Sequence, residues 1–154
     1  VEGDVFVKDN LIYASNTWAD INSIPYFALI VKGNIYIGAG VTRLDGLYVA
    51  QPLNDGSKGE IYTCRDPSNG NKITLNMDAV CDNQLSVYGS FVANRLVLQR
   101  THGTLWAGTL AEPASAANIA EVFQGVPTMY IASPPGPMNV GEYDSIRALP
   151  PIAQ

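Results

Sequence analysis

The fold of this chain is decided by the stretch ALIVKGNIYI, residues 28–37. Two runs of strand-forming residues in it are separated by little more than Gly33. In the second run Ile35 and Ile37 share one face of a strand, and Tyr36 lies on the opposite face. A tight hairpin normally uses Asn-Gly or Asp-Gly and reverses the chain, whereas a single glycine between runs marks a sharp bend. The stretch therefore predicts two strands joined by a corner at which the chain does not reverse.

Related blocks, each a glycine followed closely by β-branched or aromatic residues, occur at residues 3–7, 33–37, 46–49, 59–63 and 89–93. Their glycines are spaced 30, 13, 13 and 30 residues apart. Repeated units of this kind cannot bury a face alone, but stacked turns share a continuous core. We therefore expect an all-β fold, a parallel β-solenoid. An antiparallel β-sandwich, whose short strands alternate in the same way, is the alternative.

The last third of the chain changes character. Ser115 is a suitable helix N-cap and Gly125 a suitable stop, which predicts a short capping helix near residues 115–124. One more strand, Thr128 to Ala132, and an extended tail are expected after it. A length of 154 residues suits one domain. We expect a single exported domain over residues 1–154, with its body at about 1–110 and the helix and tail at about 111–154.

The composition excludes several classes of partner. Charged residues make up 15% of the chain, against about 25% in typical domains. The net charge is −5, and the nine Lys and Arg residues are scattered, which argues against a nucleic-acid partner. No apolar run approaches the length of a membrane span. We therefore expect no nucleic-acid partner and no membrane-spanning segment.

The chain has two cysteines, Cys64 and Cys81. The segment between them opens with RDPSNGN, residues 65–71, which is dense in turn-forming residues. A disulfide that closes this loop in an oxidising compartment is the favoured interpretation, and two buried free thiols are the alternative. The spacing does not suit zinc. A disulfide would place the protein outside the cell or at its surface.

No catalytic or cofactor motif stands out. His102 is the single histidine, and no Gly-x-Ser-x-Gly elbow accompanies it. The carboxylates considered for a glycosidase pair, Asp45, Glu60, Asp66, Asp78 and Asp82, form no compact motif. Oxygen-bearing residues in and beside the cysteine loop could hold calcium, but turn chemistry explains them equally well. We expect no enzyme activity, no metal and no cofactor.

Exposed tyrosines are the candidate surface-contact residues. Alternation along the strands places Tyr36 and Tyr88 on the outward face, and analogy between the blocks adds Tyr48 and Tyr62. A tyrosine ladder could stack on sugars or pack against a neighbouring protein. Aromatic ladders also stabilise sheets without any ligand. Trp18 and Trp106 lie outside the repeats and are expected to pack in loops or caps.

Several blocks also resemble a known group of proteins: IVKGNIYI (30–37), LDGLYVAQ (44–51), GEIYTC (59–64), GSFVA (89–93) and YDSIRALPP (143–151). They are similar to the C-terminal regions of uncharacterised bacterial pilin-like (PilX-like) cell-surface proteins. The resemblance covers roughly residues 28–105 and the tail. It implies an exported location and a β-helical body, and it implies no activity.

Three functions follow as hypotheses. The first is a non-enzymatic structural or assembly module, such as a subunit or tip domain of a surface filament, whose partners are copies of itself or other surface proteins. The second is an adhesin-type module that binds a glycan or a surface through its tyrosines. The third is a carbohydrate-active enzyme, for which the sequence offers least support.

Overall fold

The structure, a computed structural model, describes residues 1–15, 17–66, 68–103, 118–127 and 129. Its helical segments are a short 3-10 helix, η1 (Ile21–Ser23), and one α-helical turn, α1 (Met77–Val80). The strands are β1 (Val5–Val7), β2 (Ala28–Lys32), β3 (Ile35–Gly38), β4 (Arg43–Gln51), β5 (Glu60–Arg65), β6 (Leu85–Ala93), β7 (Arg95–Val97) and β8 (Glu121–Gln124).

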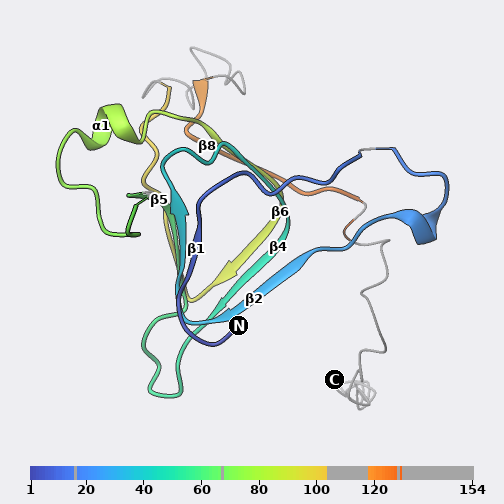
Figure 1. The fold of residues 1–154 in the computed structure, drawn as a ribbon, viewed down its shortest axis with the longest axis horizontal. Helices are drawn as coiled ribbons and strands as arrows, with labels where there is room; N and C mark the ends of the chain where they lie inside the picture. Colours follow the sequence, from blue (N-terminus) through green and yellow to red (C-terminus); the bar gives the residue numbers. More distant parts are fainter. Residues whose placement is uncertain (16, 67, 104–117, 128, 130–154) are drawn as a thin grey trace, which may run out of the picture.

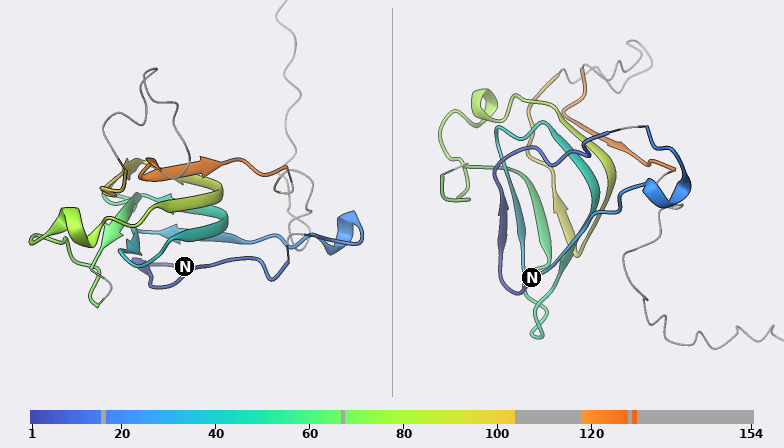
Figure 2. Two further views of the ribbon diagram at one scale, coloured as in Figure 1. Left: turned by 90° about the horizontal axis from the view of Figure 1, so that it is seen from above. Right: turned by 45° about the vertical axis from the view of Figure 1, so that its right-hand side comes forward.

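The strands form two four-stranded sheets (Figures 1 and 2). The first sheet has the order β1-β3-β5-β7 and the second has the order β2-β4-β6-β8. The chain therefore crosses between the sheets after every strand, and each strand pairs with the strand two places further along. Every ladder between these strands is parallel, as in the pairing of Val5 with Ile35 and of Leu44 with Val87.

The expected β-solenoid with a capping helix is wrong. Two four-stranded, all-parallel sheets with little helix are found instead, and parallel pairing of this kind is typical of α/β proteins. The antiparallel β-sandwich is wrong as well, because the strand ladders all run parallel.

The reason for the error lies in the glycine blocks, which are not equivalent units. Gly3, Gly33 and Gly59 stand just before strands of the first sheet, whereas Gly46 and Gly89 lie inside β4 and β6 of the second sheet and pair with each other. A Cβ atom at Gly89 would lie 1.9 Å from the carbonyl oxygen of Gly46. The second kind of glycine is thus required by close approach of two strands rather than by a corner between strands.

Over the residues that the structure describes, the predicted capping helix at residues 115–124 is also wrong. Residues 121–124 form strand β8, which pairs with β6 through Leu85 to Tyr88, and residues 115–117 lie outside the described part. Parallel strand pairing with β6 outweighs the local helix signal, because Val122 and Phe123 also suit a strand. The predicted strand at residues 128–132 lies outside the described residues except for Met129.

The core lies between the two sheets. The first sheet contributes Val7, Ile35, Ile37 and Ile61, and the second contributes Val31, Leu44, Tyr48, Ala50, Leu85 and Val87. These side chains occupy alternate positions along their strands, as the period of a half-buried strand requires. A row of aromatic rings crosses the second sheet beside this core, with edge-to-face contacts that join Phe27, Tyr48, Phe91 and Phe123.

The predicted disulfide is confirmed. Cys64 and Cys81 are bonded, with their Cα atoms 6.0 Å apart. Both cysteines are buried against Ala39 and Ile73, and the segment between them carries α1 at the side of the sheets (Figure 1). A structural disulfide is typical of proteins outside the reducing cytosol.

Arg100, in the segment after β7, binds backbone carbonyls of β3, β5 and neighbouring loops. Its side chain is buried, and its guanidinium donates hydrogen bonds to the backbone carbonyls of Thr63, Ala39, Asn83, Gly38 and Val41. Burial lowers the pKa of Arg100 to about 10, with Glu121 acting against that shift. The group therefore stays charged at neutral pH, and five carbonyl dipoles solvate it.

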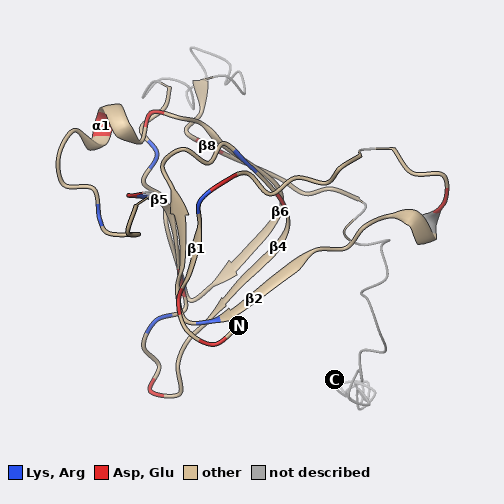
Figure 3. Cartoon of the chain, viewed as in Figure 1, with Lys and Arg blue, Asp and Glu red and all other residues tan. Residues whose placement is uncertain are grey.

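No helix within the described residues has both the length and the apolar character needed to cross a membrane. Charged residues in the described part are spread over loops and strand ends (Figure 3).

Candidate ligand-binding site

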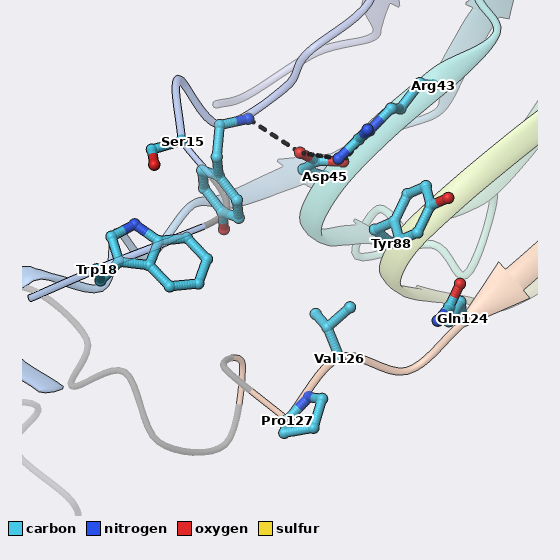
Figure 4. A pocket seen from close by; sticks show the side chains of 9 residues that line it. Ser15, Trp18, Arg43, Asp45, Tyr88, Gln124, Val126 and Pro127 are labelled. Atoms are coloured by element: carbon cyan, nitrogen blue, oxygen red, sulfur yellow. Dashed lines mark hydrogen bonds and ion pairs between the residues drawn. The ribbon is translucent and has the colours of Figure 1, made fainter.

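A cavity of about 410 Å³ opens at one side of the second sheet (Figure 4). Residues from three places surround it: the segment between β1 and η1, the strands β4 and β6, and the end of β8 with the residues after it. Its lining consists of Tyr13, Ser15, Trp18, Arg43, Asp45, Tyr88, Gln124, Val126 and Pro127.

Strand register builds one wall of this cavity. Asp45 on β4 pairs with Tyr88 on β6, and Tyr88 pairs with Gln124 on β8. The three residues thus occupy the same level on three neighbouring strands. Their neighbours Leu44 and Val87 point the other way and are fully buried in the core, so the position of the wall is fixed by the packing behind it.

An ion pair lies beside this wall. Arg43 Nε is 2.9 Å from Asp45 Oδ1, and Arg43 Nη2 is 3.2 Å from Asp45 Oδ2. The side chain of Asp45 is only 4% exposed, whereas that of Arg43 is 45% exposed. The guanidinium carbon also lies 4.4 Å from the centre of the Tyr88 ring. The hydrogen bond to Asp45 raises the pKa of Arg43. The pair is therefore held in one geometry, with one charge cancelling the other.

Asp45 also anchors the opposite wall. Its Oδ2 accepts a hydrogen bond of 2.9 Å from the backbone N–H of Tyr13. The hydroxyl of Tyr13 accepts a hydrogen bond of 3.1 Å from the backbone N–H of Phe27. Burial raises the pKa of Tyr13, which stays neutral. Tyr13 is thus fixed at its backbone and at its ring tip, and both contacts orient the segment that carries Ser15 and Trp18.

Figure 4 shows Trp18 on one side of the cavity, with Tyr88 and Gln124 facing it from the other side. Val126 and Pro127 lie between them at the lower edge. The cavity therefore offers aromatic surfaces on two sides, with an ion pair, a hydroxyl and an amide at intervals around it. Such a mixture of apolar surface and a few placed polar groups is typical of small-molecule sites.

The described lining of the cavity contains one carboxylate. Asp45 is the single carboxylate in the lining, and both of its oxygens are engaged by Arg43 and Tyr13. A glycosidase needs a second carboxylate across the cleft. Within the described residues no group of His, Cys, Asp and Glu side chains is arranged to hold a metal ion.

The structure separates the four predicted contact tyrosines. Tyr88 lines the cavity. Tyr36 and Tyr62 lie half-buried on the first sheet, where their rings stack with centres 5.2 Å apart. The expectation that Tyr48 faces outward is wrong, because this side chain is fully buried and its hydroxyl donates to the carbonyl of Asp45. Burial is the main cause of a raised pKa for Tyr48.

The other residues considered from the sequence are dispersed. His102 Nδ1 lies 2.8 Å from the carbonyl oxygen of Asp82. Glu60 binds Arg95 and the hydroxyl of Tyr62. In the cysteine loop, Asp66 and Asn69 accept hydrogen bonds from backbone N–H groups two residues ahead, which is turn chemistry.

Sequence reasoning missed the cavity, because its walls come from distant segments. Trp18 was expected only to pack in a loop, and Arg43 carried no expected role. A usable signal existed in Arg43 and Asp45, since residues two apart on a strand lie on the same face and their opposite charges can pair. Trp106 lies outside the described residues.

Comparison with known proteins identifies no relative. No protein-family model matches the chain, and no curated protein or solved structure matches it. The resemblance to pilin-like surface proteins therefore stays a prediction.

Proposed function

We propose that this protein is a non-enzymatic binding module that takes a saccharide into the cavity between Trp18 and Tyr88. The observation that carries the proposal is the placement of aromatic rings on opposite sides of a neutralised Arg43–Asp45 pair. Of the hypotheses from the sequence, the adhesin-type function thus gains most from the geometry.

Saccharides fit this lining because a sugar ring has apolar faces and a polar edge. The rings of Trp18 and Tyr88 offer apolar surface, while Ser15 and Gln124 offer hydrogen-bonding groups at the same cavity. Arg43 uses Nε and Nη2 for Asp45, which leaves donors on its exposed side for a ligand hydroxyl. Because the charge of Arg43 is already cancelled, an uncharged sugar suits the cavity better than an acidic one.

A cell-surface location supports such a role. The disulfide is consistent with a protein outside the cytosol, and the resemblance to pilin-like proteins points in the same direction. A glycan displayed by another cell or matrix would be the natural ligand class at such a location.

Glycan-array screening of the wild type and of Trp18→Ala tests the proposal. We expect the wild type to retain uncharged glycans and Trp18→Ala to lose them by about tenfold, as removal of a stacking ring implies. Tyr36→Phe is the matched control, since its ring lies on the other sheet, and it should bind like the wild type. Equal retention by Trp18→Ala, or no retention by the wild type, would refute the function.

A self-assembly role is the second candidate, and one observation favours it. Leu11, Ile12, Phe27 and Ile30 expose apolar side chains near β2. This strand is at the edge of its sheet, although its end at Ile30 and Lys32 is already hydrogen-bonded to Val1 and Gly3. Exposed apolar edge strands are prone to pair with another chain. Light scattering over a concentration series should then show oligomers that Ile30→Lys abolishes. A wild type that stays monomeric throughout would remove this candidate.

A further inference from the structure

The outward face of the first sheet carries a second aromatic group. Phe6, Tyr36 and Tyr62 occupy matching positions on β1, β3 and β5. A side chain at Gly70 would touch the rings of Phe6 and Tyr36, so the cysteine loop lies against this face. The guanidinium carbon of Arg65 lies over two of these rings, 3.9 Å from the centre of Tyr62 and 5.6 Å from that of Tyr36.

Arg65 lacks the partners that a buried arginine needs. The residue is only 8% exposed, and its Nε has no hydrogen-bond partner. Its terminal nitrogens donate hydrogen bonds to none of the described residues and, unlike Nε, are not fully enclosed. Buried polar groups are nearly always hydrogen-bonded, and an unpaired buried charge is costly. This guanidinium is therefore prepared for an acceptor that the described chain does not supply.

The two carboxylates nearest to Arg65 in the strand and in the sequence are already engaged. Glu60 accepts hydrogen bonds from the hydroxyl of Tyr62 and pairs with Arg95 at 2.7 Å. Asp66 accepts from the backbone N–H of Ser68 at 2.8 Å. Both are therefore held in place by other donors.

In two other arginines of this protein, the guanidinium group has hydrogen-bond acceptors. Arg43 forms a two-point ion pair with Asp45. Arg100 is as deeply buried as Arg65, but its guanidinium reaches five backbone carbonyls. Arg65 has neither kind of hydrogen-bonded acceptor. The pKa of Glu60 is lowered by its hydrogen bonds with Tyr62 and Arg95 and also by the nearby charge of Arg65, so Glu60 balances part of that charge without binding it.

We propose that Arg65 is the anchor of a carboxylate-binding site on the first sheet, suited to a uronic acid. The terminal edge of a guanidinium binds a planar carboxylate by two parallel hydrogen bonds, and the stacked tyrosines hold the guanidinium in one plane. This site is separate from the cavity at Trp18, which is built on the second sheet and suits uncharged sugars. Failure of the one proposal leaves the other standing.

Isothermal titration calorimetry with three small ligands tests the site. Glucuronate carries both the carboxylate and the sugar ring, acetate carries only the carboxylate, and glucose carries only the ring. With Trp18→Ala, which lacks the stacking ring of the cavity, we expect glucuronate to bind and glucose not to bind. Binding of acetate with the same affinity would show that the carboxylate alone is recognised, whereas weaker binding of acetate would show that the sugar ring contributes.

Variants locate the binding. Arg65→Met keeps the length and removes the charge, and it should weaken glucuronate binding by about tenfold or more. Arg65→Lys keeps the charge but loses the planar fork, and it should bind with intermediate affinity. Lys32→Gln removes a positive charge from β2 of the second sheet and should leave the affinity unchanged. Trp18→Ala should also leave it unchanged, which separates this site from the cavity.

Two results would overturn the proposal. One is a wild type that gives no heat with glucuronate or acetate. The other is equal affinity in wild type and Arg65→Met, with circular dichroism that shows both to be folded. If Arg65→Met does not fold, Arg65→Lys decides: undiminished affinity in that variant would count against two-point recognition.

Discussion

At the scale of single residues, two tyrosines are unusual. The hydroxyl of Tyr48 donates to the carbonyl of Asp45 in the core, and that of Tyr13 accepts from Phe27 at the edge of the cavity. Burial is the main cause of a raised pKa in both. Their phenolate forms are therefore disfavoured in the folded protein relative to the unfolded chain.

Because the pKa values of Tyr13 and Tyr48 are raised, the stability of the folded protein should fall at alkaline pH. The ordinary tyrosine pKa is 10.0, so the unfolded chain loses these protons first as the pH rises. Stability is then fully present below pH 10.0 and falls as the pH climbs toward the folded-state pKa values. Chemical denaturation at stepped pH should show this fall, and Tyr48→Phe should reduce its slope. An unchanged slope in Tyr48→Phe would contradict the assignment to this residue.

Gly89 gives a second prediction at this scale. An added Cβ atom would lie 1.9 Å from the carbonyl oxygen of Gly46, so β4 and β6 would have to separate there. We expect Gly89→Ala to destabilise the fold by roughly 2–4 kcal/mol, measured by urea denaturation. Gly40→Ala is the matched control, because nothing lies within 4 Å of its added Cβ. Similar stability in the two variants would show that the strands adapt freely.

At the scale of elements, the disulfide fixes the loop that carries α1. We expect the double variant Cys64→Ala/Cys81→Ala to lose about 3 kcal/mol of stability, because the unfolded chain is no longer constrained. The measurement is thermal unfolding of both proteins under oxidising conditions, with reduced wild type as the control. Reduced wild type should unfold near the temperature of the variant, and a large difference between them would show that the substitutions act through packing instead.

Element by element, the sequence allowed the strands to be predicted but not their grouping. Alternation around Ile35 and Ile37 correctly placed both residues in the core. The glycine blocks misled, because the aromatic residue follows the glycine by three positions in the first sheet and by two in the second, as with Tyr36 and Tyr48. Since strand side chains alternate with a period of two, that one-residue difference reverses the face. This offset can be read from the sequence, but its significance depends on knowing that the strands belong to two different sheets.

The candidate site was less predictable than the strands. Tyr88 was found by alternation, but Trp18 and Val126 reach the cavity from segments more than a hundred residues apart. Strand β8 was mistaken for a helix, because its pairing with β6 is a long-range interaction that local propensity does not encode. Features that a single segment specifies could therefore be predicted from the sequence, and features that depend on two distant segments could not.

At the scale of the whole molecule, the path of the chain predicts slow folding. Each strand pairs with the strand two places along, so that Val5 must find Ile35 and Leu44 must find Val87. Such distant pairings must close loops before any contact forms. Stopped-flow refolding with the disulfide intact should give times on the order of milliseconds to seconds. Refolding in microseconds would mean that local structure, rather than strand pairing, limits the rate.

The wall of the cavity also determines which substitutions could change the surface that the cavity presents. Tyr88 and Gln124 occupy adjacent positions on neighbouring strands and face the cavity, whereas the residue before Tyr88 is locked in the core. Substitutions at these two codons would alter the contact surface while the scaffold stays intact. Beside them, the Arg43–Asp45 pair would remain as a constant feature. The contact surface of the cavity can thus be varied at Tyr88 and Gln124 without disturbing the packing of Val87 behind it.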